Sequence, residues 1–177
     1  PIILLIIAII VAGGLYVVYN FIYQNNVDLK NKKYTYIYIR TGAGYDEVLD
    51  TLISRKILIN RISFEQVAKK KKYPEMVHAG RYKISAGMSN NTLINELRAG
   101  LQVPIKIVFN NIRKREELAG KLGEKLEPDS AKILKAFNNE DLLEKYGFNR
   151  ENMLALFIPN TYELKWNTSP EEFIARM

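Results

Sequence analysis

The chain has 177 residues and a formal net charge of +7, and all of its 26 Lys and Arg and 19 Asp and Glu lie beyond residue 23. This uneven distribution excludes a simple cytosolic globule, and the lack of a second long apolar run excludes a polytopic membrane protein. The absence of Cys excludes a disulfide scaffold, a zinc ribbon and a thiol nucleophile, and the single His78 excludes a metal site built on several imidazoles.

Residues 1–23 are apolar and long enough to cross a membrane as a helix. Such a helix is about 34 Å long, and a bilayer core is about 30 Å thick. Its aromatic residues gather at the C-terminal end, where an aromatic belt would lie. A cleaved signal peptide has an apolar region of only about 7 to 15 residues, and a buried core helix would need partners. We therefore predict a membrane anchor.

The orientation of this anchor is left open by the sequence. Lys30, Lys32 and Lys33 follow it closely, which favours a cytoplasmic C-terminal part, but the positive-inside rule compares both flanks and the chain starts at Pro1. At the other end, a helix-start signature (Ser169, Pro170 and Glu172) is followed by only two turns of chain. We therefore expect a fragment cut at both ends.

Residues 24–33 are polar and are interpreted as a spacer. Beyond them the order strand, turn, helix occurs three times, at spacings too uneven for a solenoid. The predicted strands are residues 34–40, 81–85 and 105–109. The helices that follow them are predicted at residues 46–55, 89–99 and 113–126. A turn at residues 110–111 joins the third strand to the third helix. Ser89 is the expected N-cap and Gly100 the stop of the second helix. Further helices are predicted at 63–72, 130–137, 140–146 and from Ser169.

Two basic clusters, Lys69–Lys72 and Arg113–Arg115, are candidates for contacts with phosphates. No nucleic-acid recognition motif accompanies either of them, and a solvated helix face explains both more simply. Anionic lipid head groups or an anionic wall polymer remain alternative partners.

Aromatic residues give two further signals. Tyr34, Tyr36 and Tyr38 alternate along one predicted strand, which fits strand propensity but also the faces of sugar rings. The stretch Phe157–Glu163, followed by Trp166, combines aromatics, a Pro turn, amides and a carboxylate. A carboxylate beside apolar aromatics can act as a general acid, and sugar-cleaving enzymes work with such groups. A Pro turn before a short strand explains this stretch nearly as well.

In combination, these features resemble the MltG-type endolytic lytic transglycosylases of bacterial cell walls. The chain has one N-terminal membrane helix and a small LysM-like βα module that begins at Tyr36. The segment from Ala79 through Gly87-Met88-Ser89 to Gly100 is similar to the family pattern A-G-x-Y…M-[ST]…L…L-x-x-G. Phe157–Tyr162 is similar to its motif F-x-P-[DN]-T-Y.

The resemblance implies cleavage of the bond from N-acetylmuramic acid to N-acetylglucosamine, leaving a 1,6-anhydro end. One Glu serves as acid and then as base, because the nucleophile is the substrate's own 6-hydroxyl. The family's usual Glu lies five residues before the motif Pro, where this chain has Leu154. Glu163 and Glu151 are the candidate replacements, and we prefer Glu163 because it lies in the aromatic, amide-rich cluster. The substrate-binding residues expected from this motif are Asn160, Thr161, Tyr162 and Trp166.

We therefore predict an α+β protein: a transmembrane anchor (1–23), a linker (24–33), a LysM-like module (34–102) and the N-terminal part of a catalytic domain (103–177). The resemblance implies a single-pass protein of the cytoplasmic (inner) membrane with its C-terminal part on the periplasmic or outer side. No cofactor or metal and no nucleic acid is expected; glycan strands and the membrane are the expected partners, with penicillin-binding proteins as possible protein partners. A later acidic segment of the family would lie beyond Met177, so we expect the fragment alone to be inactive.

Two alternatives remain open from the sequence. The first is a non-catalytic, membrane-anchored protein of the same fold that binds or organises peptidoglycan, which Leu154 favours. The second is a membrane-surface or nucleic-acid module that acts through its basic face.

Overall fold

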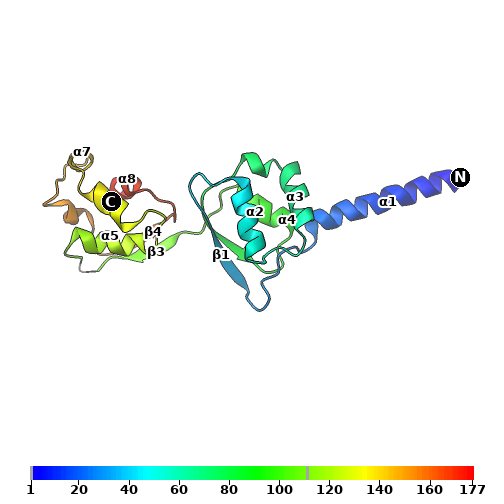
Figure 1. Ribbon diagram of the computed structural model, residues 1–177, viewed down its shortest axis with the longest axis horizontal. Coiled ribbons are helices and arrows are strands. Elements are labelled where there is room, and N and C mark those ends of the chain that lie inside the picture. Colours follow the sequence, from blue (N-terminus) through cyan, green and yellow to red (C-terminus); the bar gives the residue numbers. More distant parts are fainter. Residues whose placement is uncertain (1, 111) are drawn as a thin grey trace. The chain divides into compact units, whose positions relative to one another are not determined.

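The computed structural model of the protein describes residues 2–110 and 112–177. The chain contains both helices and strands (Figure 1), which confirms the predicted α+β class. The chain divides into two compact units, with the boundary between Gln102 and Val103. Each unit has a two-stranded antiparallel sheet and a hydrophobic core of its own.

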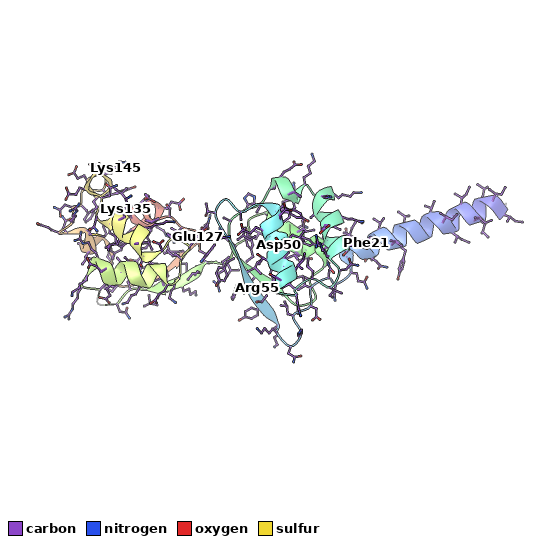
Figure 2. The ribbon with its side chains drawn as sticks, viewed as in Figure 1. Phe21, Asp50, Arg55, Glu127, Lys135 and Lys145 are labelled. Carbon is purple, nitrogen blue, oxygen red and sulfur yellow. The ribbon has the colours of Figure 1, made fainter. Side chains whose placement is uncertain are left out.

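The first unit begins with α1 (Ile2–Tyr23), the one helix among the described residues that is long and apolar enough to span a membrane. None of its residues is buried. Its side chains become partly covered only near Phe21, where α1 meets the rest of the unit (Figure 2). The prediction of an N-terminal helix with the properties of a membrane span is therefore confirmed.

The remainder of the first unit packs helices against one face of a sheet. Strand β1 (Tyr34–Ile39) pairs with β2 (Gly80–Ser85), with Ile37 opposite Tyr82. Alternation places Ile37 and Ile39 in the core and leaves Tyr34 and Tyr38 exposed. The helices are α2 (Tyr45–Ser54), α3 (Arg61–Lys70), the 3₁₀ turn η1 (Tyr73–Glu75) and α4 (Asn90–Arg98).

The segment expected as a spacer is packed into this unit. Val27 is 2% exposed and belongs to its core. Isolated bridges pair Asn25 with Ser89 and Val27 with Leu58. The amide of Asn26, which is also buried, bonds to both backbone polar atoms of Asn60. Residues 25–27 therefore join α1 firmly to the helices that follow, rather than forming a free connection.

The second unit has aromatic rings packed in its core. Strand β3 (Ile105–Val108) pairs with β4 (Thr161–Leu164). Phe109, Phe137, Phe157 and Phe173 contact one another beneath this sheet, and the rings of Phe157 and Phe173 stack with an interplanar angle of 8°. The helices are α5 (Arg115–Gly123), α6 (Ser130–Phe137), α7 (Glu140–Glu144), the 3₁₀ turn η2 (Met153–Leu156) and α8 (Pro170–Arg176).

Several boundaries differ from the predictions for local reasons. Helix α3 begins at Arg61 rather than residue 63, because Asn60 caps it by accepting a hydrogen bond from the Ser63 amide. Helix α5 was predicted to reach residue 126 but ends at Gly123. A Cβ at Gly123 would lie 2.5 Å from the backbone nitrogen of Ser130, so this position must be glycine for α6 to start close by. The turn predicted at 110–111 lies partly outside the described residues.

Candidate functional site

The outer face of the β3–β4 sheet carries the preferred acid, Glu163. Its cross-strand partner in the register is Lys106, and the Lys106 ammonium lies 3.3 Å from a Glu163 carboxylate oxygen. The two side chains are 72% and 53% exposed. Alternation along the strands places Ile107 and Leu164 on the opposite, buried face. Glu163 is thus a solvent-facing carboxylate beside a cation, rather than a carboxylate enclosed by aromatic rings.

The motif residues before β4 build the loop that leads into the strand. The Phe157 ring lies in the aromatic core, and the Tyr162 ring packs on Phe109 with their centroids 5.1 Å apart. The Tyr162 hydroxyl donates to the carbonyl oxygen of Ile158 at 2.8 Å. The side-chain oxygen of Asn160 accepts a hydrogen bond of 2.7 Å from the Thr161 amide. These contacts give Phe157, Asn160 and Tyr162 structural roles in this loop, while Asn160 and Thr161 also remain exposed to solvent.

Trp166 lies in the turn after β4 and is half-buried. Its carbonyl oxygen accepts a hydrogen bond of 2.8 Å from the Glu127 amide, which ties this turn to the connection between α5 and α6. The predicted substrate-binding set is therefore distributed over the loop before β4, the strand and the turn after it. Its role in binding stays a prediction.

The family's acid position, which is Leu154 here, and the second candidate acid, Glu151, both lie on the segment before β4. Leu154, at the family's acid position, belongs to η2 and is partly buried against the core of the second unit. Glu151 is exposed in the preceding turn. That turn is closed by Asn149, whose side-chain oxygen accepts from the amides of Glu151 and Asn152. Glu151 and Glu163 therefore both reach solvent, whereas Leu154 is part of the packing.

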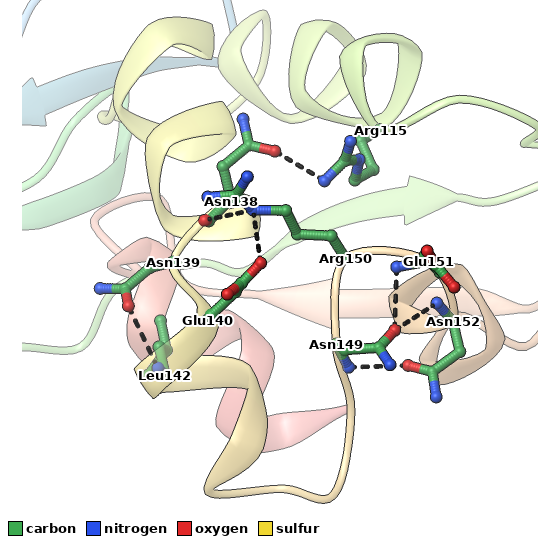
Figure 3. A network of polar contacts seen from close by, with 9 residues as sticks. All are labelled: Arg115, Asn138, Asn139, Glu140, Leu142, Asn149, Arg150, Glu151 and Asn152. Carbon is green, nitrogen blue, oxygen red and sulfur yellow. Dashed lines mark hydrogen bonds and ion pairs between the residues drawn. The ribbon is translucent and has the colours of Figure 1, made fainter.

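A polar network in the second unit was not anticipated from the sequence (Figure 3). Arg115, at the start of α5, donates from Nη1 to the side-chain oxygen of Asn138 at 2.6 Å. Arg150 donates from Nε to the Asn138 carbonyl at 2.9 Å, and the same nitrogen lies 3.3 Å from Glu140. Asn138 thus joins α5 to the turn that precedes η2. The participants are far apart in sequence, so no local motif could have indicated them.

The first unit presents a second candidate surface, on the exposed side of β1 and β2. We call Tyr34, Tyr36, Tyr38, Arg81 and Lys83 the tyrosine face. The Arg81 guanidinium lies 3.7 Å from the centroid of the Tyr36 ring, and the Lys83 ammonium lies 4.4 Å from that of Tyr34. Exposed Tyr rings beside hydrogen-bond donors have the character of a sugar-binding surface. Strand alternation alone also accounts for their position.

The buried Tyr73 and Tyr82 and the partly buried Tyr45 belong to the core of this unit rather than to a site. Burial raises the pKa of Tyr82 to about 12, and burial together with the Glu65 carboxylate raises the pKa of Tyr45 to about 12. Burial also raises the pKa of Tyr73 well above its usual value. All three phenols are therefore neutral at physiological pH and serve packing.

Comparison with known proteins places the chain in one family. The YceG-like family matches residues 37–177. A protein of Listeria monocytogenes described as YceG-like, whose crystal structure is known, is similar over 82% of this chain, with 20% sequence identity and a TM-score of 0.41. The chain spans 53% of that protein, about half of its length. A comparison with curated proteins gives no match.

Proposed function

The chain belongs to the YceG-like family, and we propose that it forms part of an endolytic lytic transglycosylase of peptidoglycan. The substrate would be a nascent glycan strand, cleaved between N-acetylmuramic acid and N-acetylglucosamine. The observation that carries this proposal is the family match itself, because it includes the motif Phe157–Tyr162 and continues through β4. The activity would belong to the whole protein, of which these residues supply one part.

In the proposed reaction a glutamic acid protonates the glycosidic oxygen as the bond from C1 of the muramyl residue breaks. The 6-hydroxyl oxygen of the same residue bonds to C1, and its proton passes to the glutamate. No water is consumed, and the product ends in a 1,6-anhydro ring. Glu163 is the preferred acid because it follows the motif directly and its carboxylate faces solvent, where a glycan strand could reach it.

The anchor would hold this chemistry at the surface of the cytoplasmic membrane. Helix α1 has the length and composition of a single span, and the remaining residues would lie on the periplasmic or outer side, where new glycan strands emerge. Penicillin-binding proteins, which make those strands, are the proposed protein partners.

A second function is favoured by one specific observation. Leu154 occupies the family's acid position and packs partly against the core of the second unit, and a leucine cannot transfer a proton. The preferred replacement, Glu163, is paired with Lys106. A non-catalytic protein that binds glycan strands, with the tyrosine face as its contact surface, would account for both facts.

The test is to incubate full-length protein with purified sacculi and to measure anhydro-muropeptides by mass spectrometry. The proposal expects activity in the wild type, loss of about 100-fold or more in Glu163→Gln, and retention in the matched Glu151→Gln. Wild-type activity in Glu163→Gln would reject that residue as the acid. Leu154→Glu restores the family's acid, so activity that appears only in this variant would establish the non-catalytic function.

A further inference from the structure

A groove lies beside Phe21, at the place where α1 meets the rest of the first unit (Figure 2). It has a volume of about 340 Å³. The residues that line it include the apolar Val18 and Phe21 of α1 and Val67 of α3, and also the polar Lys70, Lys71 and Asn91. A groove whose lining combines apolar side chains with two lysines has the chemistry that an amphiphilic anion requires.

The groove has α1 as one of its sides, and α1 is held in place by the helices of the first unit. The Asn90 side chain donates to the Phe21 carbonyl, and α1 contacts both α3 and α4. A second hollow beside Phe21 is lined by Ile59 and Asn60, at the opposite end of α3 from Lys70. Helix α3 therefore passes across the end of α1, with its first and last residues on either side of it.

This arrangement places the groove at the level of lipid head groups if α1 spans the bilayer. About 20 helical residues cross a hydrocarbon core of about 30 Å, so the last turn of α1, from Asn20 to Tyr23, would lie at the boundary of that core. The head-group layer on each side of a bilayer is about 5 to 7 Å thick. Lys70 and Lys71 line the groove together with residues of this turn, so their ammonium groups would meet phosphates rather than acyl chains.

The exposed face of α3 has the composition of a helix at a membrane surface. Ile62, Gln66 and Lys70 are four residues apart and share one face. Ile59, two residues before α3, and Ile62 are 63% and 64% exposed, and apolar side chains beside lysines are typical of a helix that lies at a membrane surface. The Lys71 ammonium donates to Asn95 at 2.7 Å, which orients it and leaves two of its protons for another acceptor.

We propose that this groove binds one anionic phospholipid of the membrane that holds α1. The lipid phosphate lies between the ammonium groups of Lys70 and Lys71, and an acyl chain follows the apolar wall formed by Val18 and Phe21. The bound lipid fixes the first unit against the membrane surface. This site is independent of the proposed glycan chemistry, because all of its residues lie in the first unit.

The experiment uses the full chain in nanodiscs of phosphatidylcholine, with and without phosphatidylglycerol of the same acyl chains. Native mass spectrometry after release counts the lipids retained by each protein molecule. The wild type is expected to retain one phosphatidylglycerol and to exclude phosphatidylcholine. Lys70→Gln/Lys71→Gln is expected to lose about tenfold or more in phosphatidylglycerol affinity. Lys69→Gln/Lys72→Gln is the matched control, because it removes the same charge from neighbouring positions outside the groove.

Equal losses of phosphatidylglycerol affinity in the two double variants would overturn the proposal. They would show that the whole basic cluster, rather than this groove, attracts the anionic lipid. Equal retention of both lipids would overturn the proposal as well. Displacement of the lipid by equimolar glycerol phosphate would show a site for the phosphate alone and not for a lipid. Val18→Trp keeps every lysine and fills the apolar wall, so unchanged lipid retention in this variant would also contradict the proposal.

Discussion

The side-chain amide of Asn90 donates a hydrogen bond of 2.8 Å to the carbonyl oxygen of Phe21, in the last turn of α1. The same amide donates to the Ser63 hydroxyl at 2.9 Å, and its oxygen accepts from Asn26 at 2.6 Å. Asn26 and Asn90 are 4% and 1% exposed. The apolar helix is therefore joined to α3 and α4 by buried, fully bonded amides, and this junction fixes how the first unit stands on its anchor.

Removal of the Asn90 amide should destabilise the first unit more than an ordinary polar substitution. Asn90→Leu removes the bond to the Phe21 carbonyl and one bond each from Ser63 and Asn26. The last two residues keep their bonds to Asn60, so we expect a cost of about 1 to 3 kcal/mol in the free energy of unfolding. Hydrogen exchange of peptides from residues 24–102 measures this loss. Asn95→Leu, on the exposed side of the same helix, should cost less than about 1 kcal/mol. Equal costs would show that the junction does not contribute to stability.

Two buried tyrosines of the same core should respond to loss of their hydroxyl with opposite signs. The Tyr82 hydroxyl donates to the His78 carbonyl at 2.9 Å, so Tyr82→Phe should cost about 0.5 to 1.5 kcal/mol. The Tyr73 hydroxyl is buried and has no hydrogen-bond partner among the described residues. Tyr73→Phe should therefore leave stability unchanged or raise it by up to about 1 kcal/mol. Hydrogen exchange of the first unit compares the two variants, and a loss in Tyr73→Phe would indicate an ordered water on that hydroxyl.

Much of the fold follows from local signals in the sequence. Ser89 caps α4 by accepting from the Thr92 amide, Gly100 takes a φ of +65° after that helix, and Ser169 and Glu172 form the expected capping box. These features depend on residues within one turn of each other, so a sequence shows them directly. The packing of residues 25–27 could not be predicted in this way, because it depends on Asn60 and Asn90, which lie far along the chain.

The candidate site was less predictable for the same physical reason. The environment of Glu163 is set by the register of β3 against β4, and this register places Lys106 opposite it. Local sequence suggested instead that aromatic neighbours would surround the carboxylate. The contact between Arg115 and Asn138 likewise depends on how α5 packs on α6. Neither strand register nor helix packing is encoded by a short motif.

The bond from Arg115 to Asn138 should be a stabilising contact of the second unit. Arg115→Ala removes a charge-assisted, partly buried hydrogen bond of 2.6 Å, at an expected cost of about 1 to 3 kcal/mol. Lys114→Ala, at the neighbouring exposed position, should change stability by about 0.5 kcal/mol or less. Urea titration followed by the fluorescence of Trp166, the chain's single Trp, compares the two. A difference below about 0.5 kcal/mol would contradict a structural role for this network.

Glu96 should make the first unit less stable as the pH rises. Burial raises the pKa of this carboxyl on α4, so the folded state keeps its proton to a higher pH than the unfolded chain. The contribution of Glu96 to stability is fully present below the pKa that it has in the unfolded chain. This contribution is lost as the pH rises through the pKa that it has in the folded protein. Glu96→Gln should therefore be slightly more stable than the wild type at neutral pH, and the difference should vanish at about pH 3, where both forms are uncharged. If Glu96→Gln were less stable than the wild type at neutral pH, the predicted effect of Glu96 on stability would be wrong.

The ion pair of Lys106 and Glu163 should contribute little to stability, and this decides how the activity of Glu163→Gln is interpreted. Because both side chains are largely exposed, a double-mutant cycle with Lys106→Gln should give a coupling of about 0.2 to 1 kcal/mol that falls with added salt. The pair of Glu117 and Lys121 on α5, 3.1 Å apart, is the matched reference. Urea titration followed by Trp166 fluorescence measures both cycles. With a coupling this small, loss of glycan cleavage in Glu163→Gln would report proton transfer, whereas a coupling above about 2 kcal/mol would attribute that loss to a weakened fold.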